Sequence, residues 1–198
     1  MKRKEIFEYL KNYIEGQIPN DVFSQFYINS KKVMKMVCKV ANKKHFSCID
    51  EYYISTIKGK FEDYFFALVG LQNSIDRYLT YKKIKHNVLT PELVLFNKWD
   101  DIIPSWLEGM PDVYYLLEKH DENKTKTKKY YKEYLASLYK YEKKPPRWLQ
   151  FAEWPIINDK PCKFIKQTGN PDDLSTDEIY YYFLDETNNQ EIVVHQYI

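Results

Sequence analysis

Residues of the kinds that catalysis and metal binding require are scattered along this sequence rather than grouped. The four histidines lie far apart, and the sequence contains no H-E-x-x-H, C-x-x-C or G-x-S-x-G motif and no glycine-rich phosphate-binding loop. His45 and Cys48 have a spacing that metal ligands can share, but nothing nearby completes a four-ligand site. We therefore expect no metal, no cofactor and no catalytic residue, and we interpret the chain as a binding protein rather than an enzyme.

Adjacent acidic residues are the remaining candidates for acid–base chemistry. Such pairs include Glu62-Asp63, Asp100-Asp101, Asp172-Asp173 and Asp185-Glu186. General acid–base catalysis requires a carboxyl group in a desolvated pocket. Asp100-Asp101, between Trp99 and Ile102-Ile103, has apolar neighbours on both sides. Because structural ion pairs look the same in a sequence, an enzyme of unrecognised type is the third of our hypotheses.

The charge of the chain is divided unevenly along its length. The formal net charge is +2, but residues 148–198 carry 3 basic and 9 acidic side chains, a net of −6, against +8 for the rest. Complementary charge speeds the association of proteins, so this acidic segment suits a basic protein partner. The residues that we expect to contact the partner are Asp172, Asp173, Asp177, Tyr180, Tyr182, Asp185 and Glu186, the acids being expected to be exposed.

A basic segment, Lys124 to Lys132, includes Tyr130 and Tyr131 and supplies the second hypothesis. Basic side chains beside aromatic rings are the components of a surface that binds single-stranded nucleic acid. Nucleic-acid-binding domains are usually strongly basic, whereas this chain is nearly neutral and has an acidic end. We therefore interpret this segment as a solvated, lysine-rich stretch that leads into a helix, and nucleic acid is not the partner that we favour.

The cysteines and the N-terminus bear on the cellular compartment. Cys38, Cys48 and Cys162 are odd in number and form no pairing motif, so we expect three free thiols and a reducing environment. The basic N-terminal residues are not followed by an apolar segment of the kind found in signal peptides. No stretch approaches the roughly 18 apolar residues of a membrane span. We expect a cytoplasmic protein that does not enter the membrane.

Apolar residues at helical spacing predict a helix-rich N-terminal region. The pattern favours helices over residues 1–15, 20–41, 61–83 and 130–141, with 61–83 as the central core helix. Asp50 is placed to cap a short helix that ends before Gly59, and Thr90-Pro91 has the residues of a helix start. Pro104 predicts a break near Ile103, and Pro111 opens a further short helix.

The pattern changes at Pro145-Pro146, beyond which short β-rich segments alternate with turns. A small antiparallel sheet is marginal by itself, so we expect it to pack on the helices. The sequence thus predicts an α+β fold, with a helical body over residues 1–143 and a β-element over 144–198 that together form one cooperative domain.

A motif in the β-element carries a resemblance. Its residues are Lys144-Pro145-Pro146-Arg147-Trp148-Leu149-Gln150, Glu153-Trp154-Pro155-Ile156, Lys160-Pro161 and Phe164-Ile165-Lys166-Gln167. This pattern resembles the C-terminal region of small cytoplasmic bacterial proteins, many of which look like immunity proteins encoded beside secreted or contact-dependent toxins. Where the family usually has a turn glycine, this chain has Asp159.

The resemblance covers about the last quarter of the chain and carries no catalytic residues. It implies a bacterial immunity-type protein that binds a cognate toxin domain and neutralises it, and such an acidic segment would suit a basic toxin. Trp148 and Trp154 have two interpretations, as docking residues or as the residues that join the sheet to the helices. Because tryptophans are usually buried, we favour the second interpretation.

Overall fold

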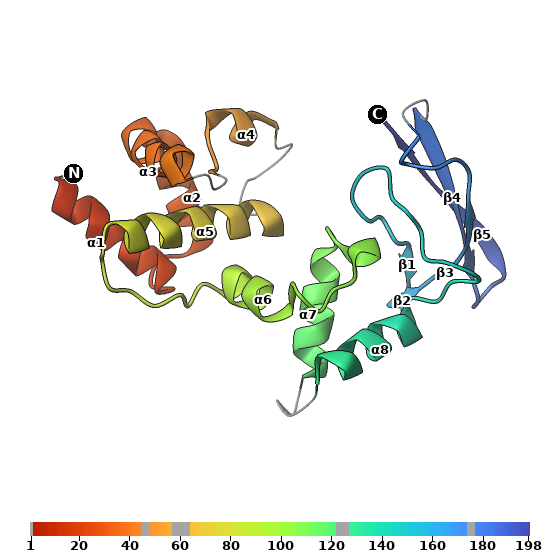
Figure 1. The fold of residues 1–198 in the computed structure, drawn as a ribbon. Helices are drawn as coiled ribbons and strands as arrows, with labels where there is room; N and C mark the ends of the chain where they lie inside the picture. The colour runs from red at the N-terminus through yellow and green to blue at the C-terminus, as the bar shows by residue number, and fades with distance from the viewer. Residues whose placement is uncertain (1, 45–47, 57–63, 122–126, 174–176) are drawn as a thin grey trace. The chain divides into compact units, whose positions relative to one another are not determined.

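The computed structural model describes the whole chain except residues 1, 45–47, 57–63, 122–126 and 174–176 (Figure 1). Helices make up most of the N-terminal part and an antiparallel sheet lies near the C-terminus, which confirms the predicted α+β fold. The chain divides into two compact units, Met1–Lys98 and Trp99–Ile198. This division lies upstream of Pro145-Pro146, so the last helices belong to the same unit as the sheet.

The first unit is helical. Its elements are α1 (Arg3–Ile14), α2 (Asn20–Asn29), α3 (Lys31–Lys44), α4 (Glu51–Thr56), α5 (Phe65–Tyr81) and most of α6 (Pro91–Trp99). The helix expected over residues 20–41 is two helices, because the chain leaves helical geometry at Ser30. Asp50 caps α4 as predicted, its Oδ1 accepting a hydrogen bond from the backbone N–H of Tyr53 at 2.9 Å.

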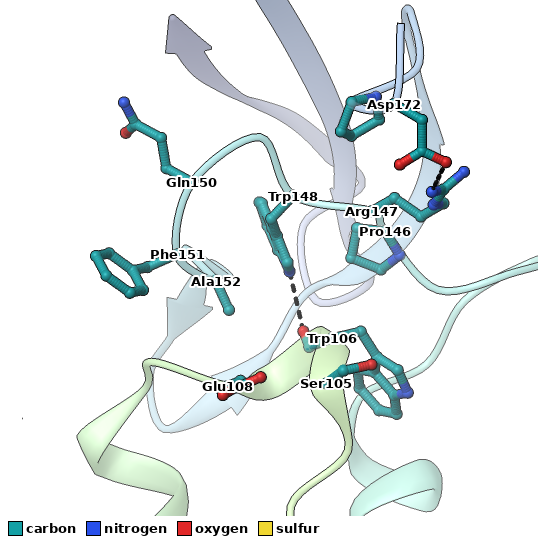
Figure 2. Close-up of a pocket in the computed structure, with 11 residues that line it drawn as sticks. Ser105, Trp106, Glu108, Pro146, Arg147, Trp148, Gln150, Phe151, Ala152 and Asp172 are labelled. Atoms are coloured by element: carbon teal, nitrogen blue, oxygen red, sulfur yellow. Dashed lines mark hydrogen bonds and ion pairs between the residues drawn. The ribbon is translucent and has the colours of Figure 1, made fainter. Parts of the chain in front are cut away.

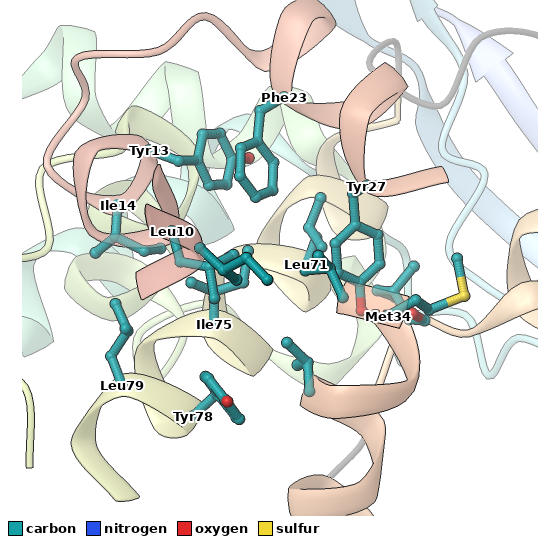
Figure 3. Packing of buried hydrophobic residues seen from close by; sticks show 14 of the residues in the cluster. Leu10, Tyr13, Ile14, Phe23, Tyr27, Met34, Leu71, Ile75, Tyr78 and Leu79 are labelled. Atoms are coloured by element: carbon teal, nitrogen blue, oxygen red, sulfur yellow. Dashed lines mark hydrogen bonds between the residues drawn. The ribbon is translucent and has the colours of Figure 1, made fainter. Parts of the chain in front are cut away.

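The core of this unit forms where α1, α2 and α3 pack on α5, the predicted central helix (Figure 3). The ring of Tyr13 stacks on that of Phe23 with a centroid separation of 3.7 Å. Leu71 and Ile75 of α5 are fully buried beneath them. The apolar residues of α5 surround much of its circumference, as expected for a helix with neighbours on several sides.

A cluster of buried and half-buried polar side chains lies among these helices. Gln72 is fully buried, and its Nε2 donates to Glu92 Oε2 at 2.8 Å while its Oε1 accepts from the backbone N–H of Leu93 at 3.0 Å. Asn20 donates to Glu92 Oε1 at 2.9 Å and accepts from the Tyr13 hydroxyl at 3.1 Å. Burial raises the pKa of the Tyr13 hydroxyl well above its usual range. We call Tyr13, Asn20, Gln72 and Glu92 the polar cluster.

The polar cluster alters one detail of the predicted start of α6. The helix begins at Pro91 as predicted, but the hydroxyl of Thr90 is buried and makes no hydrogen bond with any residue that the structure describes. The side chain of Gln72, from a different helix, accepts the hydrogen bond from Leu93 that a local cap would accept. The start of α6 is therefore fixed by tertiary contact.

The expectation of three free thiols is wrong. Cys38 and Cys48 form a disulfide across a separation of 10 residues, and Cys162 is free and buried. The middle of α3, at Cys38, and the segment before α4, at Cys48, both lie beside the hydroxyl of Tyr27, which donates to the Ile49 carbonyl at 3.1 Å. Neither cysteine lies in a pairing motif, so only the fold brings them together. The cysteines therefore do not favour a reducing compartment.

The second unit combines helices with the sheet. Its elements are the 3-10 helix η2 (Ser105–Leu107), α7 (Pro111–His120), α8 (Lys128–Leu138), β1 (Ile156–Ile157), β2 (Lys160–Pro161), β3 (Lys163–Gln167), β4 (Glu178–Asp185) and β5 (Gln190–Tyr197). The strands β3, β4 and β5 form an antiparallel sheet in that order, and β1 and β2 form a separate short hairpin. Asn158 and Asp159 of this hairpin both have positive φ, 49° and 61°, so Asp159 adopts the left-handed conformation that a turn glycine would take.

The helix expected over residues 130–141 ends at Leu138. Beyond it, the chain runs beside β3, where the backbone N–H of Phe164 donates to the Lys140 carbonyl at 2.9 Å and that of Glu142 donates to the Phe164 carbonyl at 3.2 Å. Pairing with a strand requires extended backbone, so the helix cannot continue through these residues.

Aromatic side chains form the core of the second unit. The ring of Trp154 contacts those of Tyr139, Phe164 and Phe183, and its indole N–H donates to the Cys162 carbonyl at 2.6 Å. Trp148 is half-buried, and its indole N–H donates to the Trp106 carbonyl at 2.9 Å. Both tryptophans pack within this unit, in agreement with the packing interpretation of the motif.

No helix among the residues that the structure describes has the length and apolar character needed to cross a membrane.

Candidate functional site

The sheet of the second unit has one buried face and one that meets solvent. Ile179, Tyr181 and Phe183 of β4 are fully buried, so the intervening residues Tyr180 and Tyr182 lie on the opposite face. The register places further residues beside them on β5 and β3. We define the outer sheet face by these residues: Lys166, Glu178, Tyr180, Tyr182, Glu191, Val193, His195 and Tyr197.

His195 lies at the centre of a short polar network on the outer sheet face. Its ring stacks on that of Tyr180 with a centroid separation of 4.3 Å, and its Nε2 lies 3.1 Å from Glu178 Oε2. The Tyr180 hydroxyl donates to the same carboxylate oxygen at 3.3 Å. The negative charge of Glu178 raises the pKa of the Tyr180 hydroxyl, so that group remains a neutral donor.

Exposed apolar and aromatic groups lie on either side of this network. Tyr197 is 66% exposed and pairs across the strands with Glu178, and Val193 is 47% exposed and pairs with Tyr182. The ammonium group of Lys166 lies 4.9 Å from the centroid of the Tyr182 ring. Aromatic rings with polar tips, held in place by strand pairing, are enriched at protein interfaces.

The structure corrects one of the expected contact residues. Asp185 is 5% exposed and its Oδ1 accepts a hydrogen bond from the backbone N–H of Thr187 at 2.8 Å. An aspartate that accepts from the residue two positions later stabilises a turn, here the connection between β4 and β5. Asp185 is therefore a structural residue and not an exposed acid.

The other expected acids are exposed but spread over several segments. Asp172 forms an ion pair with Arg147, and Glu186 forms one with Lys140 at 2.8 Å. The Lys140 ammonium lowers the pKa of the Glu186 carboxyl. The structure thus brings together Tyr180 and Tyr182 on the outer sheet face but does not gather all the acids around them.

Asp173 and Asp177 lie on either side of residues 174–176, which are outside the described part of the chain. Asp173 follows Asp172 in the loop before β4, where its backbone N–H donates to the Asn170 carbonyl at 3.0 Å. Asp177 directly precedes β4, and its carbonyl accepts from the backbone N–H of Ile198 at 3.0 Å. Asp177 therefore adjoins the outer sheet face through its neighbour Glu178.

Besides Lys166 on β3, five residues of this face on β4 and β5 were missing from the sequence prediction: Glu178, Glu191, Val193, His195 and Tyr197. The alternation of side chains along the two predicted strands could have found them, because residues two apart in a strand share a face. The pairing of the strands was also needed, since it sets which residues of β5 lie beside Tyr180 and Tyr182.

A pocket of about 450 Å³ lies elsewhere in the second unit (Figure 2). Trp106, Trp148 and Phe151 contribute its aromatic surface, and Phe151 is 76% exposed. Arg147 also lines the pocket, but its guanidinium donates to Asp172 and to Asn170. Since these acceptors already engage the guanidinium, the pocket does not present a cation prepared for an anionic ligand.

The basic segment lies beside the Asp100-Asp101 pair, which it contacts through Lys128. Lys128 forms an ion pair with Asp101 and lowers the pKa of that carboxyl, and Lys129 lies 3.7 Å from Glu133. Asp100 accepts a hydrogen bond from the Tyr114 hydroxyl at 3.0 Å. Both aspartates are exposed, so neither has the desolvated pocket that acid–base catalysis requires.

Some candidates from the sequence lie outside the described residues: His45, Glu62-Asp63 and residues 124–126 of the basic segment. Within the described ranges, no group of three or more His, Cys, Asp or Glu side chains is arranged to hold a metal ion.

The outer sheet face is thus the strongest candidate, because it combines exposed aromatic rings with fixed carboxylates on rigid strands. Comparisons with protein-family models, with curated proteins and with solved structures found no significant match to this chain.

Proposed function

We propose that this chain is a bacterial immunity-type protein that binds a cognate toxin domain and neutralises it by covering its active surface. The observation that carries this proposal is the outer sheet face, on which Tyr180, His195 and Tyr197 present exposed or half-buried rings between the carboxylates of Glu178 and Glu191. Residues of this kind provide the contact area and the orientation-dependent hydrogen bonds of protein interfaces.

The electrostatics of the segment favour a basic partner. The carboxylates at and beside this face are Asp177, Glu178 and Glu191, and residues 148–198 together carry a net charge of −6. A negative surface attracts a basic protein over the Debye length and raises its association rate. Enzymes that act on nucleic acid are commonly basic, so a nuclease domain is the class of toxin that this charge suits.

The proposal includes the cytoplasmic location that the resemblance implies. Disulfides persist mainly in oxidising compartments, and the Cys38–Cys48 bond therefore stands against that location. Alkylating the thiols inside the source cells before lysis measures the redox state directly. If Cys38 and Cys48 are reduced in the cytoplasm, a cytoplasmic location is compatible with the disulfide, which then forms only after the protein leaves the cell.

The test of the proposal begins with the tagged chain as bait in the source cells. The partner that co-purifies is identified, and its gene is expected to lie beside that of this protein. The binding of wild type is then compared with that of the variants Tyr180→Ala and Tyr197→Ala. Loss of an aromatic residue at the centre of an interface costs about 2 kcal/mol or more, which weakens binding by about 30-fold.

The matched control is Tyr115→Ala, since Tyr115 is a 50% exposed tyrosine of α7 in the same unit. This variant is expected to bind as wild type does. Because exposed substitutions usually change stability by less than about 0.5 kcal/mol, Tyr115→Ala and Tyr197→Ala should unfold at nearly the same urea concentration as wild type.

Charge reversal provides the second arm of the test. The double variant Glu178→Lys/Glu191→Lys should associate more slowly, and its association rate should depend less on salt. Equal rates and equal salt slopes would exclude the outer sheet face as the binding surface. Co-purification of nucleic acid that is lost on changing Lys129 and Lys132 would instead support the nucleic-acid hypothesis.

A further inference from the structure

The strand β5 is an unprotected edge of the sheet. It pairs with β4 along its whole length of eight residues without a bulge, and β4 is its single strand neighbour among the described residues (Figure 1). Natural proteins usually protect such edges with lysine, proline, bulges or a covering segment. The sequence Gln190–Tyr197 contains neither lysine nor proline. The other edge of the sheet, β3, is partly covered by the backbone of residues 140–142.

The pattern of hydrogen bonds identifies the backbone groups that face this free edge. The backbone N–H of Ile198 donates to the Asp177 carbonyl at 3.0 Å, so odd-numbered residues of β4 face β5 and bond to its even-numbered residues. The Tyr180 carbonyl faces the other way and accepts from the backbone N–H of Thr168 at 2.9 Å. It follows that Glu191 and the odd-numbered residues after it direct their N–H and C=O groups away from β4.

The free edge has a defined end. The outward carbonyl of Tyr197 accepts a hydrogen bond from Gln150 Nε2 at 2.8 Å and is therefore occupied. At the other end, Asn189 has a positive φ of 59° and belongs to the turn. The groups that remain for an added strand belong to Glu191, Val193 and His195.

We propose that a second copy of this chain binds along β5, with the two β5 strands antiparallel and Val193 on the two-fold axis. In this register, Val193 lies opposite the partner subunit's Val193, and Glu191 lies opposite the partner subunit's His195. Each of the three pairs of opposite residues exchanges two backbone hydrogen bonds. The two three-stranded sheets become one continuous sheet of six strands.

The side chains of β5 are complementary to themselves in this register. On the outer face, the apolar pair at Val193 lies between two pairs that each place the Glu191 carboxylate opposite the imidazole of His195, whose Nε2 also lies 3.1 Å from Glu178 Oε2 of its own chain. On the inner face, Ile192 lies opposite the partner's Val194, and both are aliphatic. Opposite-charge and aliphatic cross-strand pairs stabilise antiparallel sheets, whereas like charges oppose pairing.

Neighbouring registers lack this complementarity. A shift by two residues in either direction places Glu191 opposite the partner's Val193 or the partner's Tyr197, so the charge pairs are lost. A shift by one residue places inner-face residues opposite outer-face residues. The pattern of charge and apolar residues thus selects a second copy in one register over an unrelated strand, which has no reason to carry the matching sequence.

This inference does not rest on the proposed function, because it requires only the free backbone edge of β5, although Glu191, Val193 and His195 also belong to the outer sheet face. The first measurement is the mass of the purified chain alone by light scattering over a dilution series. We expect twice the chain mass of 24.1 kDa at high concentration and dissociation on dilution. A single-chain mass at every concentration overturns the proposal, including the case in which the edge binds only a different protein.

A charge exchange tests the register. The variant His195→Glu places two carboxylates opposite each other at two positions, and we expect the dimer dissociation constant to rise about tenfold. Adding Glu191→Lys restores opposite charges and should restore dimerisation. Within one chain these two residues are four apart, about 13 Å along the strand, so the rescue cannot arise inside a monomer. Failure of the second change to rescue the first overturns this register.

A cysteine pair provides a readout that does not depend on dimer stability. Opposite residues of an antiparallel hydrogen-bonded pair have Cα atoms about 5.5 Å apart, within the range of a disulfide. Oxidation of Val193→Cys should therefore yield a covalent dimer, whereas Glu191→Cys should not, since its two copies lie several residues apart across the two-fold axis. Equal cross-linking of the two variants contradicts the proposal. A circular dichroism spectrum like that of wild type confirms that each variant is folded.

Discussion

The two compact units differ in where their notable polar side chains lie, inside the first unit and on the surface of the second. In the unit of residues 1–98, the polar cluster lies inside, where Gln72 and Glu92 join one helix to another and fix the start of α6. In the unit of residues 99–198, the interior is built mainly from aromatic rings around Trp154, and the polar groups of the outer sheet face point to solvent.

The difference suggests that the polar groups of the first unit specify its fold, whereas those on the outer sheet face of the second unit can bind a partner. A buried polar group must keep its partners, so its side chain is not available to a ligand. The carboxylates and rings of Glu178, Tyr180 and His195 are held in position by a sheet whose stability comes from its other face. A partner can therefore use them without disturbing the core, which is why the second unit is the better candidate for function.

The largest expected effect concerns which fragment of the second unit can fold by itself. A fragment of residues 144–198 should fail to fold, whereas residues 99–198 should unfold cooperatively. The reason is that Tyr139 and Trp106 supply rings against Trp154, and Lys140 pairs with Phe164 through the backbone. Thermal unfolding followed by circular dichroism measures both fragments. A cooperative transition from the shorter fragment would show that the boundary at Pro145-Pro146 separates two folding units.

Removal of the central aromatic side chain is next in size. Trp154→Ala should destabilise the protein by about 3–5 kcal/mol, because Trp154 is 3% exposed and its loss leaves a large cavity. Trp154→Phe keeps most of the apolar area but loses the hydrogen bond to the Cys162 carbonyl, and should cost about 1–3 kcal/mol. Urea denaturation measures both values. Equal costs for the two variants would mean that the hydrogen bond, rather than the ring packing, dominates.

A matching change in the first unit probes its polar cluster. Gln72→Leu should cost about 3 kcal/mol, because the backbone N–H of Leu93 and the carboxylate of Glu92 lose a partner while they remain at least partly buried. The control Gln17→Leu changes an exposed glutamine of the same unit and should cost less than about 0.5 kcal/mol. If leucine is tolerated at both positions, the polar cluster does not fix the start of α6.

The smallest of these effects concerns the disulfide. Thiol titration of the denatured protein without reductant should find one thiol, that of Cys162, and not three. The double variant Cys38→Ser/Cys48→Ser should be less stable by about 2.5 kcal/mol, since the bond closes a loop across 10 residues. Wild type measured with and without reductant should show the same difference. Three titratable thiols in the protein as purified would contradict the bond.

Sequence patterns predicted the helices and strands well but not the contacts between them. The apolar stripe of residues 20–41 continues across Ser30, so periodicity could not locate the break between α2 and α3. The Cys38–Cys48 bond depends on how the middle of α3 meets the segment before α4, which no local motif records.

The candidate site could be predicted only in part for a similar reason. Tyr180 and Tyr182 were found from composition and charge, but their neighbours Glu178 and His195 depend on the pairing of β4 with β5. Asp185 and Glu186 are adjacent and chemically alike, and only the turn geometry makes the first buried and the second exposed. Charge summed along a segment gives the sign of a surface but not which residues reach it.

The positions of the tryptophans mean that tryptophan fluorescence reports the unfolding of the second unit alone. All four, at positions 99, 106, 148 and 154, belong to residues 99–198, and the first unit contains only tyrosine and phenylalanine as aromatic residues. Emission excited at the red edge of the indole band, where tyrosine does not absorb, therefore comes from one unit alone. A denaturation curve recorded by this emission reports the β-containing unit, and its comparison with a helical circular dichroism signal shows directly whether the two units unfold together.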